Sequence, residues 1–411
     1  MMLKMKCIQI FSLFLFLSNC LIAQTLIPYR VELQRKDGYK IIFNMQRKTI
    51  KGKEEWTILN ASERLKVDVI TRNNDSFFVE MPFFDSRMRL ELQKDQTISG
   101  NWIKGSSKED IQIPIVAKPY QTYRFKPLKG NATRKVNGRF DASFVDADGI
   151  IKNAVAEFSQ KGNRVTGTFL NPDGDYRFLE GIVTGDSLML SCFDGSHAYY
   201  FGATVKPDGK IINGLFVAGA TFKQNWSAVP NAKVELVEDD VMVFVKPGQN
   251  RLNFKFPDLD SVMVSINDER FKNKVVVIQL MGSWCPNCMD ETAFLSNYYK
   301  QNKSRGVEVI GLSYEYTTDF KRSEKLLRKF QKRYNVEYPI LNTGVTSGDS
   351  LRTEKTLPQL TPIKAFPTTL YIGKDGTIRE IHPGFSGPAT GIHYTEFCAN
   401  FEKTIAKLLN E

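Results

Sequence analysis

The sequence predicts a multidomain α+β protein in which an antiparallel all-β region, closed as a barrel or a sandwich, precedes a C-terminal α/β domain. Two observations lead to this prediction. Short alternating runs separated by Asp-Gly and Gly-Asp turns fill much of residues 25–235, whereas β-branched runs alternate with helix-period segments over residues 254–411. A chain of 411 residues is also long enough for two or three domains with cores of their own.

The first residues have the pattern of an export signal. Two lysines precede an apolar run over residues 8–17, which is shorter than the roughly 20 residues that a membrane-spanning helix needs. We expect residues 1–23 to be a signal peptide, and the protein to be exported to the periplasm or cell envelope. The alternative is a lipid anchor on Cys20, because the preceding residues, LSNC, loosely resemble a lipobox and would tether the chain to a membrane at its N-terminus only.

Charge and cysteine content narrow the function classes. The formal net charge of +11 favours acidic or anionic partners, but no run of basic and aromatic residues resembles a nucleic-acid platform, so no nucleic-acid partner is expected. Four cysteines follow the leader, too few for a disulfide framework in a chain of this length. We expect Cys192 and Cys398 to be buried small hydrophobic side chains; the alternative is a bridge between them that ties the two halves together.

Residues 25–235 are predicted to form the all-β region. Asp-Gly and Gly-Asp turns recur along it, and the last four are spaced by about one strand plus a turn. Because helix-period segments are nearly absent, an antiparallel meander that closes as a sandwich or an up-and-down barrel is expected. A faint similarity between residues 83–102 and 192–216 leaves open two β units within the region.

After a linker over residues 236–253, the pattern changes to alternating strands and helices in residues 254–411. A run at residues 262–266 is a candidate entry strand. The main predicted elements are, in order, strand 275–280, helix 286–303, strand 307–314, helix 321–333, strands 368–373 and 377–382, and helix 394–409. This order, β-α-β-α followed by a β-hairpin and a helix, is the thioredoxin arrangement with an insertion before strand 368–373.

The motif WCPNC, residues 284–288, lies between the first of these strands and its helix. Pro286 suits the first helical position, which puts Cys285 at the N-cap. There the sulfur faces unpaired backbone N–H groups and the positive end of the helix dipole, which stabilise a thiolate. We therefore expect Cys285 to attack a partner disulfide and Cys288, one turn further and more covered, to resolve the mixed disulfide.

Two structural alternatives for this pair are weaker. A zinc site needs four ligands, and the remaining cysteines and histidines supply no second pair at short spacing, so no metal is expected. An inert disulfide that closes a two-residue loop restrains little of the unfolded chain and so adds little stability.

Two further residues are candidates for the site. Pro367 directly precedes a strand that we expect beside strand 275–280; if its peptide bond is cis, the neighbouring backbone turns toward the sulfurs and offers an edge to an extended polypeptide. A trans turn proline is the alternative. Glu291 lies three residues past Cys288 on an adjacent helix face, where a buried carboxylate exchanges protons with that thiol, or an ordinary first-turn acid complements the helix dipole.

The segments GSWCPNCMDE, AFPTTLYIGKDG and IHPGFSGPATG resemble the TlpA/ResA-type thiol-disulfide oxidoreductases of the thioredoxin superfamily, in the long exported form with a β-rich N-terminal region. The resemblance is strong over residues 254–411 and weak before them. It implies a redox pair, a cis-proline, an acid that assists proton transfer and a tryptophan that shields the couple, which are Cys285 with Cys288, Pro367, Glu291 and Trp284. Where relatives carry Thr or Val before the cis-proline, this chain has Phe366, so a more apolar substrate edge is expected.

The leading hypothesis for function is a reductase of protein disulfides that is recharged by an upstream thiol donor and needs no cofactor. One alternative is a binding module, in which the β region recognises a ligand or a protein and the thioredoxin-like domain is accessory. Another is a thiol peroxidase, which is disfavoured because such sites usually place Thr or Ser where this chain has Gly282.

Overall fold

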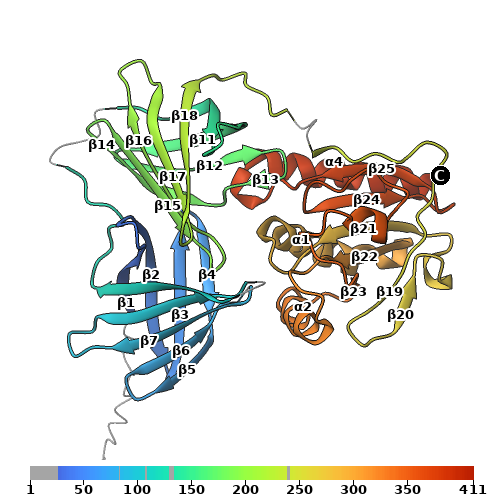
Figure 1. Ribbon diagram of the computed structural model, residues 1–411, viewed down its shortest axis with the longest axis horizontal. Helices are drawn as coiled ribbons and strands as arrows, with labels where there is room; N and C mark the ends of the chain where they lie inside the picture. Colours follow the sequence, from blue (N-terminus) through green and yellow to red (C-terminus); the bar gives the residue numbers. More distant parts are fainter. Residues whose placement is uncertain (1–25, 83, 107–108, 129–133, 238–240) are drawn as a thin grey trace, which may run out of the picture.

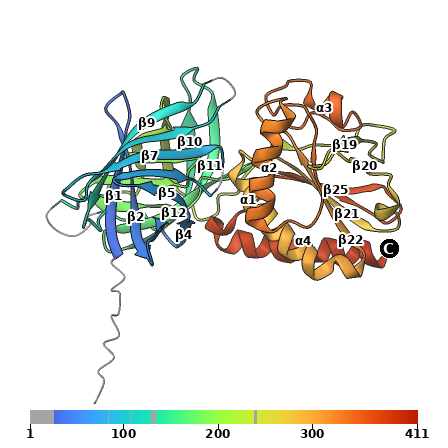
Figure 2. The same ribbon diagram turned by 90° about the horizontal axis from the view of Figure 1, so that it is seen from below.

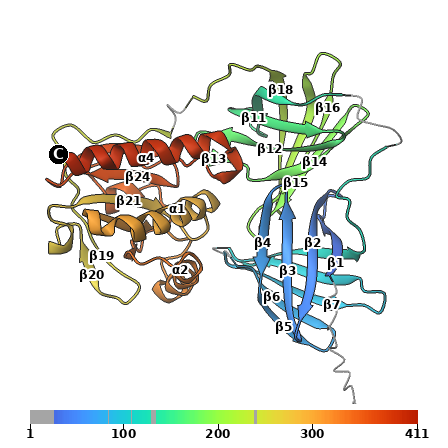
Figure 3. The same ribbon diagram turned by 180° about the vertical axis from the view of Figure 1, so that it is seen from behind.

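The computed structural model describes residues 26–82, 84–106, 109–128, 134–237 and 241–411 (Figure 1). Two antiparallel β-barrels precede a thioredoxin-like α/β domain, which confirms the predicted fold class. The barrels lie one above the other in Figure 1, and both face the same side of the α/β domain; Figures 2 and 3 show the same arrangement from other sides. The predicted leader and Cys20 lie outside the described residues.

The first barrel is one nine-stranded antiparallel sheet in the order β4-β3-β2-β1-β9-β8-β7-β6-β5. Its strands alternate inward and outward side chains, as in β6, where Phe77 and Val79 are buried between exposed neighbours. The strands are β1 Leu26–Gln34, β2 Lys40–Ile50, β3 Lys53–Asn60, β4 Glu63–Val67, β5 Val69–Asn73, β6 Ser76–Glu80, β7 Ser86–Leu92, β8 Ile98–Lys104 and β9 Ile111–Pro119.

The second barrel is a nine-stranded sheet that closes on itself, because β11 and β12 near the two ends of its strand order also pair with each other. Its interior is mainly aromatic; the rings of Phe201 and Phe216 stack with their centroids 4.3 Å apart. The strands are β10 Gly138–Val145, β11 Ile151–Lys161, β12 Arg164–Asn171, β13 Gly174–Asp175, β14 Leu179–Thr184, β15 Ser187–Phe193, β16 Ala198–Val205, β17 Ile211–Ala218 and β18 Phe222–Pro230.

The α/β domain is built on a five-stranded sheet in the order β23-β22-β21-β24-β25. Every residue of β21 is buried, because helices α1, α2 and α4 cover one face of the sheet and chain segments outside these helices cover the other. Its elements are β19 Lys255–Pro257, β20 Met263–Ser265, β21 Val275–Met281, α1 Pro286–Asn302, β22 Val307–Ser313, α2 Phe320–Tyr334, β23 Ile340–Asn342, α3 Arg352–Thr356, β24 Thr368–Ile372, β25 Ile378–Pro383 and α4 Ile392–Asn410. No helix of the described residues is long and apolar enough to span a membrane.

Two local predictions differ from the structure. The candidate entry strand at residues 262–266 corresponds to β20, which pairs with β19 in a separate two-stranded sheet rather than joining the central one. The Asp258 carboxylate accepts hydrogen bonds from two backbone N–H groups of the intervening turn and so closes this hairpin. Within residues 236–253, expected to be a linker, Val243 and Leu252 are buried in the core of the α/β domain.

Candidate functional site

The cysteine pair lies where strand β21 passes into helix α1. Pro286 is the first residue of the helix and Cys285 is its N-cap, as the motif predicts. Cys285 and Cys288 form a disulfide bond, with their Cα atoms 5.2 Å apart. The Cys288 backbone N–H donates to Cys285 Sγ at 3.2 Å, so a backbone donor of the first helical turn, which has no partner within the helix, points at this sulfur.

The loop that contains Pro367 forms the other side of the site. The Phe366–Pro367 peptide bond is cis, as the resemblance implies. Strand β24 begins directly after it and pairs antiparallel with β21, with Thr368 opposite Leu280. This pairing brings the Phe366 carbonyl oxygen to 3.5 Å from Cys285 Sγ. The sulfur therefore lies between the helix terminus and the backbone before the cis-proline.

Trp284 lies in a wall of aromatic rings beside the disulfide. Its indole Nε1 donates to the Tyr314 carbonyl at 2.7 Å, which fixes the ring. The ring stacks on Tyr316 at 4.9 Å between centroids and meets Phe366 edge-on at 5.7 Å. The backbone before the cis-proline is thus flanked by aromatic rings, among them Phe366.

Glu291 is fully buried and points into the domain toward the sheet. Its carboxylate accepts hydrogen bonds from Gln279 Nε2 at 2.8 Å and from the Thr369 hydroxyl at 2.5 Å. Burial raises the pKa of Glu291 to about 7, and these two bonds only partly oppose the shift. Gln279 also donates to the Cys288 carbonyl at 3.0 Å, which connects the carboxylate to the turn that carries this cysteine. Of the two alternatives for Glu291, the buried carboxylate is the one observed.

A second buried acid, Glu315, was not predicted from the sequence. Its carboxylate accepts from the Ser283 backbone N–H at 2.8 Å, from the Ser283 hydroxyl at 2.6 Å and from the Ser313 hydroxyl at 2.6 Å. Burial raises its pKa. These bonds hold the segment directly before Trp284. One feature of the sequence could have predicted Glu315 at the site: it lies just past the end of β22. Side chains at the carboxyl ends of neighbouring parallel strands, here β21 and β22, meet at one edge of the sheet.

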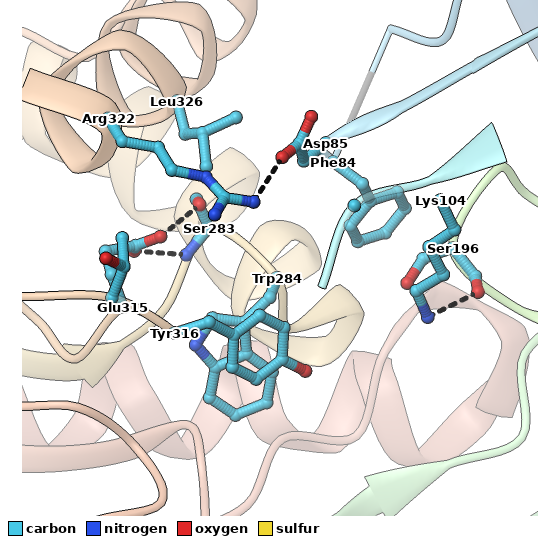
Figure 4. Close-up of a pocket in the computed structure, with 12 residues that line it drawn as sticks. Phe84, Asp85, Lys104, Ser196, Ser283, Trp284, Glu315, Tyr316, Arg322 and Leu326 are labelled. Carbon is cyan, nitrogen blue, oxygen red and sulfur yellow. Dashed lines mark hydrogen bonds and ion pairs between the residues drawn. The ribbon is translucent and has the colours of Figure 1, made fainter. Parts of the chain in front are cut away.

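The first barrel reaches this edge of the α/β domain. Figure 4 shows Phe84 of the first barrel across a narrow cavity from Trp284 and Tyr316, with an ion pair from Arg322 to Asp85 beside it. The cavity has a volume of about 30 Å³, which is room for one or two water molecules. Cys285 is 4% exposed and Cys288 is fully buried. The barrels thus lie over the mouth of the site.

Among the described residues, no three His, Cys, Asp or Glu side chains are grouped to hold a metal ion. Cys192 and Cys398, the two cysteines outside the pair, are both free thiols and are not bridged to each other. Cys192 is buried, as expected, whereas Cys398 on α4 is only half-buried.

Comparisons with known proteins agree with this site. Residues 247–381 match the AhpC/TSA family. The chain is 28% identical over 132 residues to thiol-disulfide oxidoreductase ResA of Bacillus thuringiensis, covering 32% of this chain and 66% of that relative, just under two thirds. It is 25% identical over 140 residues to ResA of Bacillus subtilis, covering 34% of this chain and 69% of that relative.

Solved structures also resemble the C-terminal part. A thiol-disulfide oxidoreductase from Bacteroides fragilis is 18% identical and covers 36% of this chain and 99% of its own, with a TM-score of 0.28. A thioredoxin-family thiol:disulfide interchange protein from Chlorobium tepidum is 18% identical and covers 39% of this chain and 95% of its own, with a TM-score of 0.29. The sequence matches identify a thioredoxin-like domain with distant ResA-type relatives in the C-terminal third of the chain.

Proposed function

We propose that this chain, whose residues 247–381 carry an AhpC/TSA thioredoxin-like domain, reduces protein disulfides by thiol-disulfide exchange at Cys285 and Cys288. One observation carries the proposal. The Cys285 sulfur caps helix α1 and lies 3.5 Å from the carbonyl before the cis-proline, so a polarised sulfur and a peptide-binding edge meet at one point.

The exchange starts from the reduced pair. The Cys285 thiolate attacks one sulfur of the substrate disulfide and forms a mixed disulfide with it, while the other substrate sulfur leaves as a thiolate and takes up a proton. Cys288, as a thiolate, then attacks the Cys285 sulfur and releases the substrate sulfur that was bonded to it. The substrate gains two electrons, and the pair reaches the oxidised state that this structure contains. A thiol donor of two electrons reduces the pair again.

The neighbouring residues have defined roles in this scheme. Glu291, with a pKa of about 7, is suited to accept the proton that Cys288 loses, and Gln279 connects its carboxylate to the Cys288 turn. Trp284 shields the couple from water, and Glu315 positions the segment that carries it. The cis Pro367 holds the backbone edge for the substrate.

Insulin reduction tests the proposal. With dithiothreitol as donor, the wild-type protein is expected to accelerate precipitation of the insulin B chain, and Cys285→Ser is expected to abolish the acceleration. Cys192→Ser is the matched control, because that thiol is buried outside the site, and it should behave as the wild type. Equal rates for the wild type and Cys285→Ser contradict the proposal. Peroxide consumption in a parallel assay should be absent, since a peroxidase is not proposed.

We propose in addition that the protein acts outside the cytoplasm, in the periplasm or cell envelope. The support is the lysine-led apolar run in residues 1–23. Cell fractionation tests this proposal, and recovery of the full-length chain in the cytoplasm alone contradicts it.

A further inference from the structure

A loop of the second barrel crosses the mouth of the redox site. The loop between β12 and β13 approaches both sides of this mouth. Figure 3 shows β13 beside helix α4 of the α/β domain. On one side, Asn287 within the cysteine motif donates to the Asp173 carbonyl at 3.3 Å. On the other, a Cβ added to Gly384 would meet the Pro172 carbonyl oxygen at 2.8 Å, and the Gly384 N–H donates to the Pro367 carbonyl at 2.8 Å.

This contact leaves no room for a substrate strand at that point. An extended chain that pairs with a backbone edge lies about 4.8 Å from it. A Cβ built on Gly384, next to the cis-proline, would lie only 2.8 Å from the Pro172 carbonyl oxygen, so no side chain fits between this carbonyl and the Gly384 backbone. The loop therefore takes the space that an extended polypeptide needs between helix α1 and the cis-proline loop.

A buried ion cluster anchors the loop. Arg177, two residues past the end of β13, pairs with Asp290 on α1, with Glu63 of the first barrel at 2.9 Å and with Asp194 of the second barrel at 3.5 Å. Asp175 accepts from the Arg177 backbone N–H at 2.6 Å. One guanidinium thus joins both barrels to the helix that carries the redox pair. Its side chain is 8% exposed, and removing one partner of such a largely buried ion pair is costly, because the other charge stays behind unpaired.

The first barrel closes the site from the opposite flank. Phe84 packs in the same apolar cluster as Cys285. Asp85 accepts from Arg322 of α2 at 3.0 Å, and Lys329 of α2 donates to the Phe84 carbonyl at 3.3 Å. A cavity of about 30 Å³ remains on this flank, between Phe84 and the Trp284 ring.

We propose that residues 172–177 form a specificity-determining gate over the redox pair, so that a folded or extended protein disulfide reaches Cys285 only when the Arg177 cluster opens, whereas a small disulfide or alkylating reagent reaches it without that opening. The partner that opens the gate is a polypeptide, since only a chain able to pair along the cis-proline edge competes for the space of the loop. This inference rests on the proposed function for its substrate class, but the gate itself is testable without turnover.

The test uses the reduced full-length chain with the four other cysteines, Cys7, Cys20, Cys192 and Cys398, replaced by serine, so that only the redox pair carries thiols. Alkylation is timed with iodoacetamide and with a maleimide that carries a 5-kDa polyethylene glycol. In the Arg177→Gln variant, we expect the bulky reagent to react at least about ten-fold faster than in the wild type, while iodoacetamide changes little. Arg164→Gln is the matched control, because Arg164 of β12 is half exposed and pairs with Glu180 within the same barrel.

Two results would contradict the proposed gate: in Arg177→Gln, alkylation by the bulky reagent at the wild-type rate, or an equal acceleration of alkylation by both reagents. If Arg177→Gln does not fold, Glu63→Gln/Asp290→Asn removes charge at nearly constant side-chain size, and the same acceleration is expected.

Insulin reduction completes the test and separates the two proposals. Arg177→Gln should raise kcat/KM for insulin about ten-fold and leave the rate with a small aromatic disulfide nearly unchanged. A wild-type protein that protects Cys285 from the bulky reagent but reduces neither substrate contradicts the proposed function and supports the gate. A wild-type protein that reduces both substrates but shows no such protection contradicts the gate alone.

Discussion

The replacement Glu291→Gln removes a buried negative charge and keeps the shape of the side chain. The carboxylate is fully buried and accepts from Gln279 and Thr369. A glutamine at this position can still accept from the Gln279 amide, and its own amide can donate to the Thr369 hydroxyl. The variant is therefore expected to fold, and its stability should differ from that of the wild type mainly through the lost ionisation.

The size of the effect follows from the pKa. Burial raises the pKa of Glu291 from 4.5 to about 7. The folded state therefore holds a proton that the unfolded chain releases between these pH values, and the contribution of Glu291 to the stability of the wild type is highest below pH 4.5, falls as the pH rises toward 7 and is level above it. The total loss is about 3 kcal/mol. Glu291→Gln lacks this loss and should be more stable than the wild type at pH 8 by an amount approaching it.

Urea unfolding followed by circular dichroism between pH 4 and 8 measures the effect. The free energies of unfolding of the wild type and Glu291→Gln should diverge steadily across this range. Glu354→Gln, at an exposed position on α3, is the matched control and should follow the wild type at every pH. Wild-type and Glu291→Gln curves that run parallel from pH 4 to 8 refute the assignment of a buried, protonated carboxyl to this position.

Three further outcomes are expected. In a Cys7→Ser/Cys20→Ser background without reductant, unfolding should expose two titratable thiols, Cys192 and Cys398, and a count of zero contradicts the free state of both. Phe201→Ala should lower the free energy of urea unfolding by about 3–5 kcal/mol, because the ring is fully buried in the aromatic core of the second barrel. Phe222→Ala, half exposed on β18, should lower it much less, and equal losses would contradict the observed packing. Asp319→Ala should lower the free energy of unfolding by about 1 kcal/mol, because the Asp319 carboxylate caps α2 by accepting from two backbone N–H groups. An unchanged stability would contradict this capping role.

Much of the α/β domain could be predicted because its signals are local. The buried strand β21 reads as an apolar run broken only by Gln279, and Pro286 marks the first turn of α1, so the place of Cys285 follows from neighbours in the sequence. The predicted helix 286–303 and the observed α1 differ by one residue at the end. The pairing of the strand after Pro367 with β21 also followed from element order alone.

The site could be predicted only in part, because long-range packing decides which acids are buried. Asp290 and Glu291 are adjacent in the sequence, yet Glu291 points to Gln279 inside the domain, whereas Asp290 meets Arg177 of the second barrel. No local pattern distinguishes the two, since the difference depends on the position of a chain segment more than 100 residues away. The packing of Phe84 in the apolar cluster that contains Cys285 also depends on long-range contacts between domains.

The linker illustrates the same limit. Its loosened pattern predicted a connection, but Val243 and Leu252 are buried against the sheet. Isolated apolar residues in an irregular segment carry no periodicity, so their burial depends on a surface that the rest of the domain provides.

The account depends most directly on Cys285 as the attacking sulfur and Cys288 as the resolving one. Cys288→Ser should arrest the exchange after the first step, so incubation of the reduced variant with oxidised insulin and mass mapping of the products should find insulin bonded to Cys285. Insulin attached instead to Cys192 or Cys398, or no covalent adduct at any cysteine, would contradict the account.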